Sequence, residues 1–305
     1  MPYRLEMSES SQKGLARIAA EQVDRACRDL ARRDTVEGIH KLRQRCKRLR
    51  AILRLARPAL GRRYARENRR FRDIARAVSG PRDEQILIDT FDALLAAQGK
   101  SVDRRQFTPT RQQLLKRHRL ALEATALPDM AWLEAELERA RDALDDWTPA
   151  IDRFRSLREG LVETSRRARQ AMRQAERAND EASFHEWRKQ VKYHRHHCEL
   201  LSGVWKAPME TRAREAHRLA DLLGEEHDLA MLAQVLSDSD VAVQGHDKTR
   251  LVLVMIAERR LSLQREALLL GQRLFAEHPR ALGKRIKRYR SAARREGRKT
   301  APPVS

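Results

Sequence analysis

The sequence predicts an all-α protein built from two copies of one helical unit. Ala, Leu, Arg and Glu dominate its 305 residues, with only 12 Gly, 10 Pro and 5% aromatic residues, so most segments favour helix on intrinsic grounds. Apolar residues recur with helical spacing between the breakers. In addition, a shift of 145 residues superimposes one polar motif on another without a gap. We therefore expect two internally duplicated helical bundles flanking a basic groove or pore.

Periodicity and breakers divide the first half into helices near residues 8–32, 35–57, 61–79, 82–97, 110–126 and 129–145. The second half should repeat this plan, and residues 249–276, with no Pro and one Gly, should form one extended helix. Asp34 is a good N-cap because Glu37 follows at capping-box spacing, and Asn179 can cap the equivalent helix.

The domain boundary should follow Trp147, where Pro149 closes an acidic helical stretch. We therefore assign residues 1–147 to the first half and residues 148–296 to the second. Residues 297–305 should form a basic disordered tail.

The charge of the chain predicts a polyanionic partner. Lys and Arg number 64 against 43 Asp and Glu, giving a formal net charge of +21 and a pI near 10.8. Of the 64 cations 52 are Arg, whose planar fork matches phosphate oxygens bidentately. A G+C-rich genome that encodes Arg in place of Lys is the alternative explanation of this ratio.

Targeting and redox signals indicate a cytoplasmic protein without a membrane partner. Cys27, Cys46 and Cys198 are scattered and odd in number, which argues against a disulfide framework or a zinc site. The N-terminus has no apolar signal core, and the longest apolar run, residues 251–257, is too short to span a bilayer.

The repeated motif predicts two cationic helix faces. The two copies, in register, are His40-x-x-Arg43-x-x-x-Lys47-x-x-Arg50 and His185-x-x-Arg188-x-x-x-Lys192-x-x-Arg195. At 100° per residue each set spans an arc of about 80° along about 15 Å of helix. Arg54 extends the first set, while Leu42, Cys46, Leu49 and Leu53 fall on the opposite, core-facing side.

Residues 41–57 contain no acid, so pairing within the helix cannot neutralise the first stripe. The same shift also superimposes Arg69 on Arg214. A single cationic stripe is usually a solvated face, but two stripes with identical residue types in identical register favour a polyanion site. Hydrogen-bonded core residues are the alternative for His40 and His185.

No catalytic or metal motif is evident, so we expect a non-enzyme without metal or cofactor. His194, His197 and Cys198 have spacing that permits two ligands on one helix face, but the first half does not repeat them. The sequence has no P-loop, H-E-x-x-H or nucleophile elbow. His227-Asp228 could suggest acid-base work, although local capping or pairing by Asp228 is the simpler explanation.

These motifs resemble the CHAD family, the conserved-histidine α-helical domain. The resemblance is carried by the segments 184–193 and 219–229, by His40-Lys41-Leu42-Arg43 with Lys47-Arg48-Leu49-Arg50, and by Arg82-Asp83. It covers residues 8–295. It implies two similar helical bundles around a basic groove or pore, binding of inorganic polyphosphate, and targeting to polyphosphate granules.

The resemblance implies these anion contacts: His40, Arg43, Lys47, Arg50, Arg82, His185, Arg188, Lys192, Arg195 and His227. Two features depart from the family pattern. At the shift of 145 residues Arg82 aligns with His227 and not with another Arg. In addition, Ser79-Gly80-Pro81 replaces the usual leucine-glycine turn. The E-x-E-x-K signature of the catalytic CYTH domain that often accompanies the family is absent, so the chain resembles the stand-alone form.

We therefore expect a polyphosphate-binding protein associated with polyphosphate granules. Adding Arg54, Arg69 and Arg214 to the family positions completes the predicted contacts. Single-stranded RNA or DNA, bound non-specifically, is the alternative partner, but such proteins usually offer aromatic platforms for bases and this chain has few aromatic residues. Docking on an acidic protein is a third hypothesis and would need an exposed apolar patch. The sequence leaves the oligomeric state open.

Overall fold

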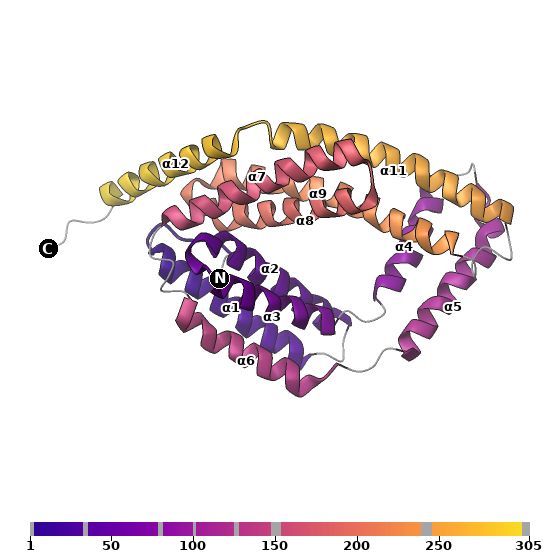
Figure 1. The fold of residues 1–305 in the computed structure, drawn as a ribbon, viewed down its shortest axis with the longest axis horizontal. Helices are drawn as coiled ribbons and strands as arrows, with labels where there is room; N and C mark the ends of the chain where they lie inside the picture. Colours follow the sequence, from indigo (N-terminus) through magenta and orange to yellow (C-terminus); the bar gives the residue numbers. More distant parts are fainter. Residues whose placement is uncertain are drawn as a thin grey trace.

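The computed structural model describes residues 3–32, 36–78, 82–99, 102–124, 128–147, 154–238 and 246–300. In these ranges the regular structure is entirely helical, which confirms the predicted all-α class. Figure 1 labels the α-helices: α1 (Ser11–Ala31), α2 (Val36–Leu60), α3 (Arg63–Ala77), α4 (Arg82–Ala97), α5 (Thr108–Ala124), α6 (Met130–Trp147), α7 (Phe154–Ala178), α8 (Glu181–Leu200), α9 (Lys206–Ser237), α11 (His246–Leu274) and α12 (Pro279–Thr300). Short 3₁₀ turns precede α5 (Arg104–Phe107) and α9 (Ser202–Val204).

The ends of the observed helices follow local capping chemistry. Ser10 caps α1, because its Oγ accepts a hydrogen bond from the Lys13 amide at 3.1 Å. The predicted cap of α8 was wrong by one residue. Asp180 caps the helix by accepting from the Ser183 amide at 2.7 Å, whereas Asn179 lies before the cap with a left-handed φ of 49°. The predicted cap Asp34 lies outside the described residues.

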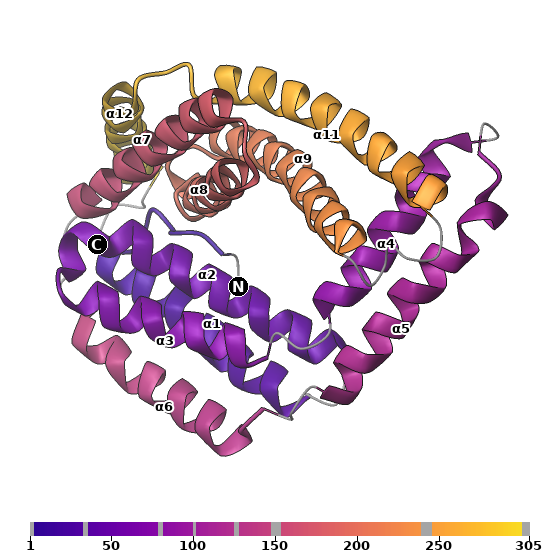
Figure 2. The same ribbon diagram turned by 45° about the vertical axis from the view of Figure 1, so that its right-hand side comes forward.

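Three hydrophobic clusters hold the helices together. The first joins α1, α2, α3 and α6 to the beginning of α7, the end of α8, the beginning of α9 and α12. The second joins α4 and α5 to the end of α9 and to α11, and the third joins α7, α8, α9 and α11. Figures 1 and 2 show the result: α1, α2, α3 and α6 form one side, α7, α8, α9 and α11 the other, and α4 and α5 connect them at one end.

The hydrophobic clusters do not follow the two halves of the sequence. Helix α4 packs on α9, and its cluster includes apolar residues of α11. Residues from both assigned halves therefore share this cluster. The boundary after Trp147 stays a prediction from the sequence: α6 ends there, and residues 148–153 lie outside the described ranges.

The second half does not repeat the break between α3 and α4. A single helix, α9, spans 32 residues where the first half has two helices. In the sequence, Pro81 aligns with Glu226 at the shift of 145 residues. Proline removes an amide donor and clashes within a helix, whereas Glu226 allows α9 to continue and accepts hydrogen bonds from Arg260 and Gln264 of α11. This difference explains the single helix.

The C-terminal helix is longer than expected. α12 extends to Thr300, into the segment predicted to be a tail, and residues 301–305 lie outside the described ranges. Among the described residues, no helix is both long enough and apolar enough to cross a membrane.

Helices α2 and α7 approach closely at Gly160. A Cβ atom added to Gly160 would lie 1.9 Å from the carbonyl oxygen of Leu55, a backbone atom that cannot rotate away. Further along the same side, His197 of α8 donates from Nε2 to the carbonyl oxygen of Ala51 at 2.9 Å. Helix α2 is therefore fixed against both α7 and α8.

We expect Gly160→Ala to lower the free energy of unfolding by about 1–3 kcal/mol, because the added methyl group must push α2 and α7 apart. Chemical denaturation would measure this. Glu159→Ala on the same helix removes only a partly exposed pair with Arg155 and should change stability by less than about 0.5 kcal/mol. Equal effects of the two substitutions would contradict the close approach.

Candidate functional site

Each motif helix buries its apolar side in the core and exposes its cationic side, as the spacing predicted. Leu42, Cys46, Leu49 and Leu53 of α2 are fully buried. On α8, Trp187, Val191 and Cys198 are fully buried as well. The cations of both motifs are exposed or half-buried. The core thus fixes which side of each helix can meet a ligand.

Arg188 and Lys192 of α8 line a cavity of about 640 Å³ bounded by α4, α8 and α9. We call it the Arg188 pocket. The guanidinium of Arg188 lies against Gly224 of α9, where an added Cβ would be 3.2 Å from Nη2. The absence of a side chain at position 224 therefore leaves room for Arg188.

The Arg188 pocket is not uniformly basic. The cations come from α8, together with Arg259 of α11, which pairs with Glu225 at 2.7 Å. The carboxylates on the opposite walls come from α4 and α9: Asp89, Asp221 and Asp228. An anion would therefore bind along the α8 side of this pocket and not at its acidic walls.

Lys192 is the most perturbed cation of the motif. Burial, with the positive charges of Arg188 and Lys47, lowers its pKa to about 7 against the opposing effect of Asp228 and Asp221. Lys47 belongs to α2, so the two cationic faces approach one another at this point. A ligand that carries negative charge would relieve this repulsion.

Two histidines lie beside Arg188. The rings of His185 on α8 and His227 on α9 are stacked at a tilt, with centroids 4.4 Å apart. Burial lowers the pKa of both; His185 is lowered further by His227, and His227 by Arg188. The Nδ1 atom of each ring is buried without a hydrogen-bond partner, and His227 Nδ1 lies 3.8 Å from Glu181 Oε1. An approaching anion would stabilise the protonated form of both rings, which take up the proton from solvent.

Several motif cations have no acidic partner. No described carboxylate forms an ion pair with Arg43, Arg188 or Lys192. Two of their nitrogen atoms, Arg43 Nη1 and Arg188 Nε, are buried without a hydrogen-bond partner. Buried donors of this kind are costly unless a ligand or water accepts from them.

Other predicted residues are already engaged. Arg54 donates to Gln190 Oε1 at 3.2 Å and lies 4.2 Å from the centroid of the Tyr193 ring, so it ties α2 to α8. Arg50 donates to Asn68 on α3 at 3.1 Å, and His40 accepts from the amide of Gln44 at 2.6 Å. These contacts make Arg54 a structural link between the two helices.

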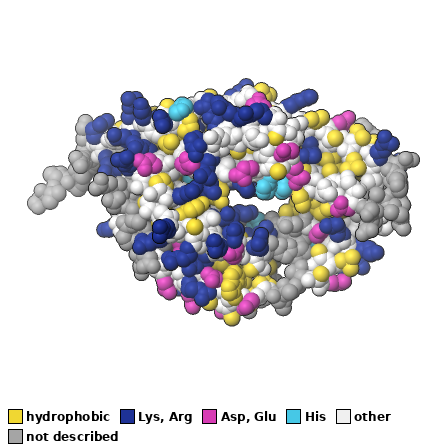
Figure 3. Space-filling model, viewed as in Figure 1, with side chains coloured by type: hydrophobic (Ala, Val, Ile, Leu, Met, Phe, Trp, Pro, Cys, Tyr) yellow, Lys and Arg dark blue, Asp and Glu magenta, His cyan; other side chains and the backbone are white. Residues whose placement is uncertain are grey.

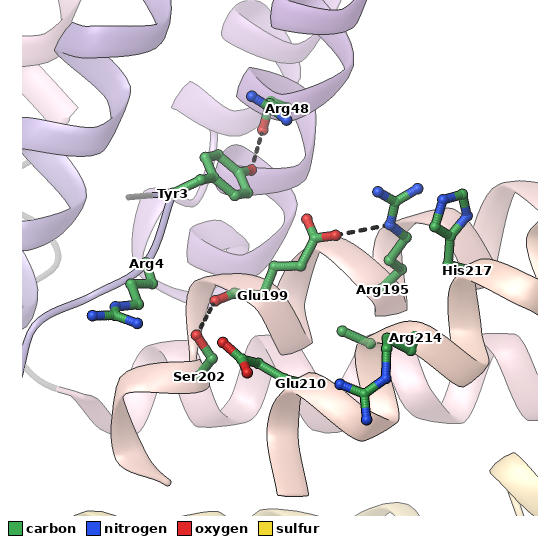
Figure 4. A pocket seen from close by; sticks show the side chains of 10 residues that line it. Tyr3, Arg4, Arg48, Arg195, Glu199, Ser202, Glu210, Arg214 and His217 are labelled. Carbon is green, nitrogen blue, oxygen red and sulfur yellow. Dashed lines mark hydrogen bonds and ion pairs between the residues drawn. The ribbon is translucent and has the colours of Figure 1, made fainter. Parts of the chain in front are cut away.

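Arg195 and Arg214 lie in a different cavity, of about 430 Å³, which Figure 4 shows with Arg48 and Tyr3 on its α2 side. Arg195 pairs with Glu199 at 2.8 Å, so this cation of the second stripe has a counterion on its own helix. Burial raises the pKa of Glu199, but His196 and Arg195 outweigh it and hold the pKa at about 2. This cavity is therefore partly neutralised.

Of the remaining predicted contacts, Arg69 lines neither cavity. Arg69 is exposed on α3. Arg82 begins α4, but its side chain lies outside the described part of the chain. The structure thus gathers Arg188, Lys192 and His227 with His185, and separates them from Arg195 and Arg214.

The buried histidines of α8 make hydrogen bonds within the core. His194 accepts from Arg212 Nε at 2.9 Å, and burial lowers the pKa of His197 to about 3. Cys198 lies 3.6 Å from His194 Nε2. Within the described ranges, no three His, Cys, Asp or Glu side chains are grouped as metal ligands.

Sequence reasoning did not single out Arg48 or Arg259. Arg48 lies in the acid-free stretch of α2, and this lack of acids in the sequence could have indicated that Arg48 belongs to a basic site. Arg259 reaches the Arg188 pocket from α11, across a tertiary contact that no sequence pattern reveals.

The surface of the molecule is open between its two sides. Figure 3 shows an opening below α8 and α9, with histidine on its upper rim and Lys and Arg on its lower rim. Histidine and basic side chains therefore face solvent on the two sides of this opening.

Comparisons with known proteins identify the family. The family model "CHAD domain" matches residues 15–237. Two solved structures share the fold: the CHAD domain from the plant Ricinus communis, with a TM-score of 0.60, and PptA from Streptomyces chartreusis, with a TM-score of 0.56. Each is 16% identical in sequence; the alignments cover 87% and 88% of this chain and 93% and 100% of the other chains.

No protein with curated annotation matched the sequence. The family model alone covers well over half of the residues, and the repeated histidine motif on α2 and α8 falls inside its range. The chain therefore belongs to the CHAD domain family.

Proposed function

We propose that this protein binds inorganic polyphosphate along the facing cations of α2 and α8, and that it associates through this polymer with polyphosphate granules. The observation that carries the proposal is the group formed by Lys192, Arg188 and Lys47, in which like charges lie close together without described acidic partners for the first two. Repulsion of this kind makes a bound polyanion stabilising.

The chemistry of the site favours polyphosphate over nucleic acid. Polyphosphate carries charge along a flexible chain without bases, so its recognition needs cation density and no stacking surface. The described residues lining the Arg188 pocket include no Phe, Tyr or Trp. Single-strand binding sites usually combine cations with such aromatic platforms.

We also propose that the two halves of the chain are duplicates of one helical plan and that they flank a basic groove, as the sequence suggested. The pairings α1 with α2 and α7 with α8 are similar in order, which supports a duplicated plan. The opening in Figure 3 offers a path on which both motif helices could contact one polymer. We propose a binding role without hydrolysis, since no catalytic motif accompanies these cations.

The first test compares long-chain polyphosphate with a single-stranded oligonucleotide of equal charge at several salt concentrations. Polyphosphate should bind more tightly at every concentration. Changing four cations to alanine should weaken polyphosphate binding at least about tenfold and flatten the salt slope by about 3, since each lost phosphate contact releases fewer counterions. The four are Arg43, Lys47, Arg188 and Lys192.

A matched control removes four exposed, ion-paired cations instead: Arg111, Arg139, Arg141 and Arg218. This control has the same net charge as the first variant and should keep most of the affinity. Equal losses of polyphosphate affinity in both variants, or an equal loss of oligonucleotide affinity in the first variant, would contradict the proposal. The thermal midpoint of each variant checks that the fold is kept.

The second test is the pH dependence of polyphosphate binding. A polyanion binds the protonated form of Lys192, whose free-state pKa is about 7, so affinity should rise about tenfold as pH falls from about 8 to about 6. His185 and His227, with pKa values below their ordinary range, add to the rise at the acidic end.

Lys192→Met should remove most of this rise, because it keeps the length of the side chain and loses the charge. Lys189→Met is the matched control, since Lys189 is exposed on the same helix and pairs with Glu186. An affinity that stays flat over this pH range in the unmodified protein would be inconsistent with our assignment of the site.

A further inference from the structure

A second basic surface lies on α12, at the end of the molecule opposite α4 and α5 (Figure 1). Residues 279–295 contain eight Arg and Lys at the solvent-facing or half-buried positions of α12 and no acid. The helix lies beyond residues 15–237, the range that the family model matches. Figure 3 shows Lys and Arg gathered over this region. The family motif therefore does not account for these charges.

A cavity of about 470 Å³ lies between α12, α7 and the beginning of α1. We call it the Arg290 pocket. Its lining includes four cations that form no ion pair with a described carboxylate: Arg158, Lys287, Arg290 and Arg294. Arg155 also lines it, but pairs with Glu159 at 2.7 Å. The N-terminus of α1 adds partial positive charge at Ser10 and Ser11.

Arg290 is held in place before any ligand binds. Its guanidinium lies 4.2 Å from the centroid of the Phe154 ring, and the side chain is half-buried. Burial, together with the charge of Arg294, lowers its pKa to about 10. A fixed guanidinium loses less conformational entropy on binding phosphate than a free surface cation.

The basic surface continues along α7. A neighbouring cavity of about 560 Å³ between α7 and α12 is lined by Arg169, Arg173 and Arg280, together with Arg166, which pairs with Glu163. A chain of phosphates longer than one group could therefore be followed by cations along both helices.

An exposed aromatic ring stands on the other flank of α12. Trp205, at the start of α9, is 53% exposed and meets Tyr289 of α12 edge-on, with ring centroids 4.6 Å apart at 89°. At 100° per residue Tyr289 and Arg294 project to opposite sides of the helix. A flexible strand crossing α12 could place phosphates on the cations and a base on Trp205.

A lipid surface fits this helix less well. The apolar side of α12 is already used, since Leu282 and Ile286 are 1% and 0% exposed against the core. An interfacial amphipathic helix needs that side free for the bilayer. Polyphosphate has no base to stack on Trp205, so the aromatic ring favours a nucleic acid.

We propose that the exposed side of α12, with the Arg290 pocket and Trp205, binds single-stranded nucleic acid at a site separate from the α2–α8 cations. The phosphodiester backbone contacts Lys287, Arg290 and Arg294, and a base stacks on Trp205. This inference does not depend on polyphosphate binding, because it concerns a different surface and a different ligand.

Fluorescence anisotropy with a labelled 20-nucleotide single strand of mixed sequence tests the proposal. Lys287→Ala/Arg290→Ala/Arg294→Ala should weaken binding at least about tenfold, and Trp205→Ala should weaken it about fivefold or more. Lys287→Ala/Arg294→Ala keeps Arg290 packed on Phe154, so it should weaken binding without affecting the fold.

Two controls separate this surface from the first one. The same α12 variants should change polyphosphate affinity by less than about threefold, and Arg188→Ala/Lys192→Ala should leave oligonucleotide affinity within about threefold. If the α12 variants bind the strand as the unmodified protein does, or if the Arg188→Ala/Lys192→Ala variant loses it instead, the proposal is overturned. Equal loss of both ligands in the α12 variants would also overturn it, since it would indicate a general polyanion surface. Loss of polyphosphate binding alone bears on the proposed function and not on α12.

Discussion

Repulsion between like charges on α2 and α8 is the constraint on which the function depends. Lys192 is half-buried beside Arg188 and within the field of Lys47, so its proton is held weakly. The chain tolerates this arrangement because the opposite sides of both helices are fully buried and fix their orientation. A ligand with repeated negative charge removes the repulsion and supplies acceptors for donors that otherwise lack them.

The fold keeps these cations in place through contacts far from them. Gly160 lets α7 approach α2, while Arg54 and His197 connect α2 to α8. Helices α4 and α5 pack on α9 and α11, so apolar clusters lie around the opening and not only on one side of it. The same connectivity leaves the exposed side of α12 at the far end, where a second ligand would not compete with the first.

Local patterns predicted much of the fold and part of the site. The spacing of Leu42 and Cys46 against Arg43 and Lys47 was sufficient to separate the core side of α2 from its cationic side. Contacts between residues of different helices could not be predicted from such spacing. The position of Arg259 in the Arg188 pocket, for example, depends on tertiary packing. One local signal was missed.

Glu199 follows Arg195 by four residues, the spacing at which helix neighbours pair, and it neutralises that cation in the structure.

The central claim can be measured most directly on Lys192 itself, by following its side-chain nitrogen by NMR as a function of pH. The account predicts a pKa near 7 in the free protein, rising by at least about 1 unit with polyphosphate bound. A free-state pKa near the ordinary lysine value of about 10.4, unchanged by the polymer, would contradict it.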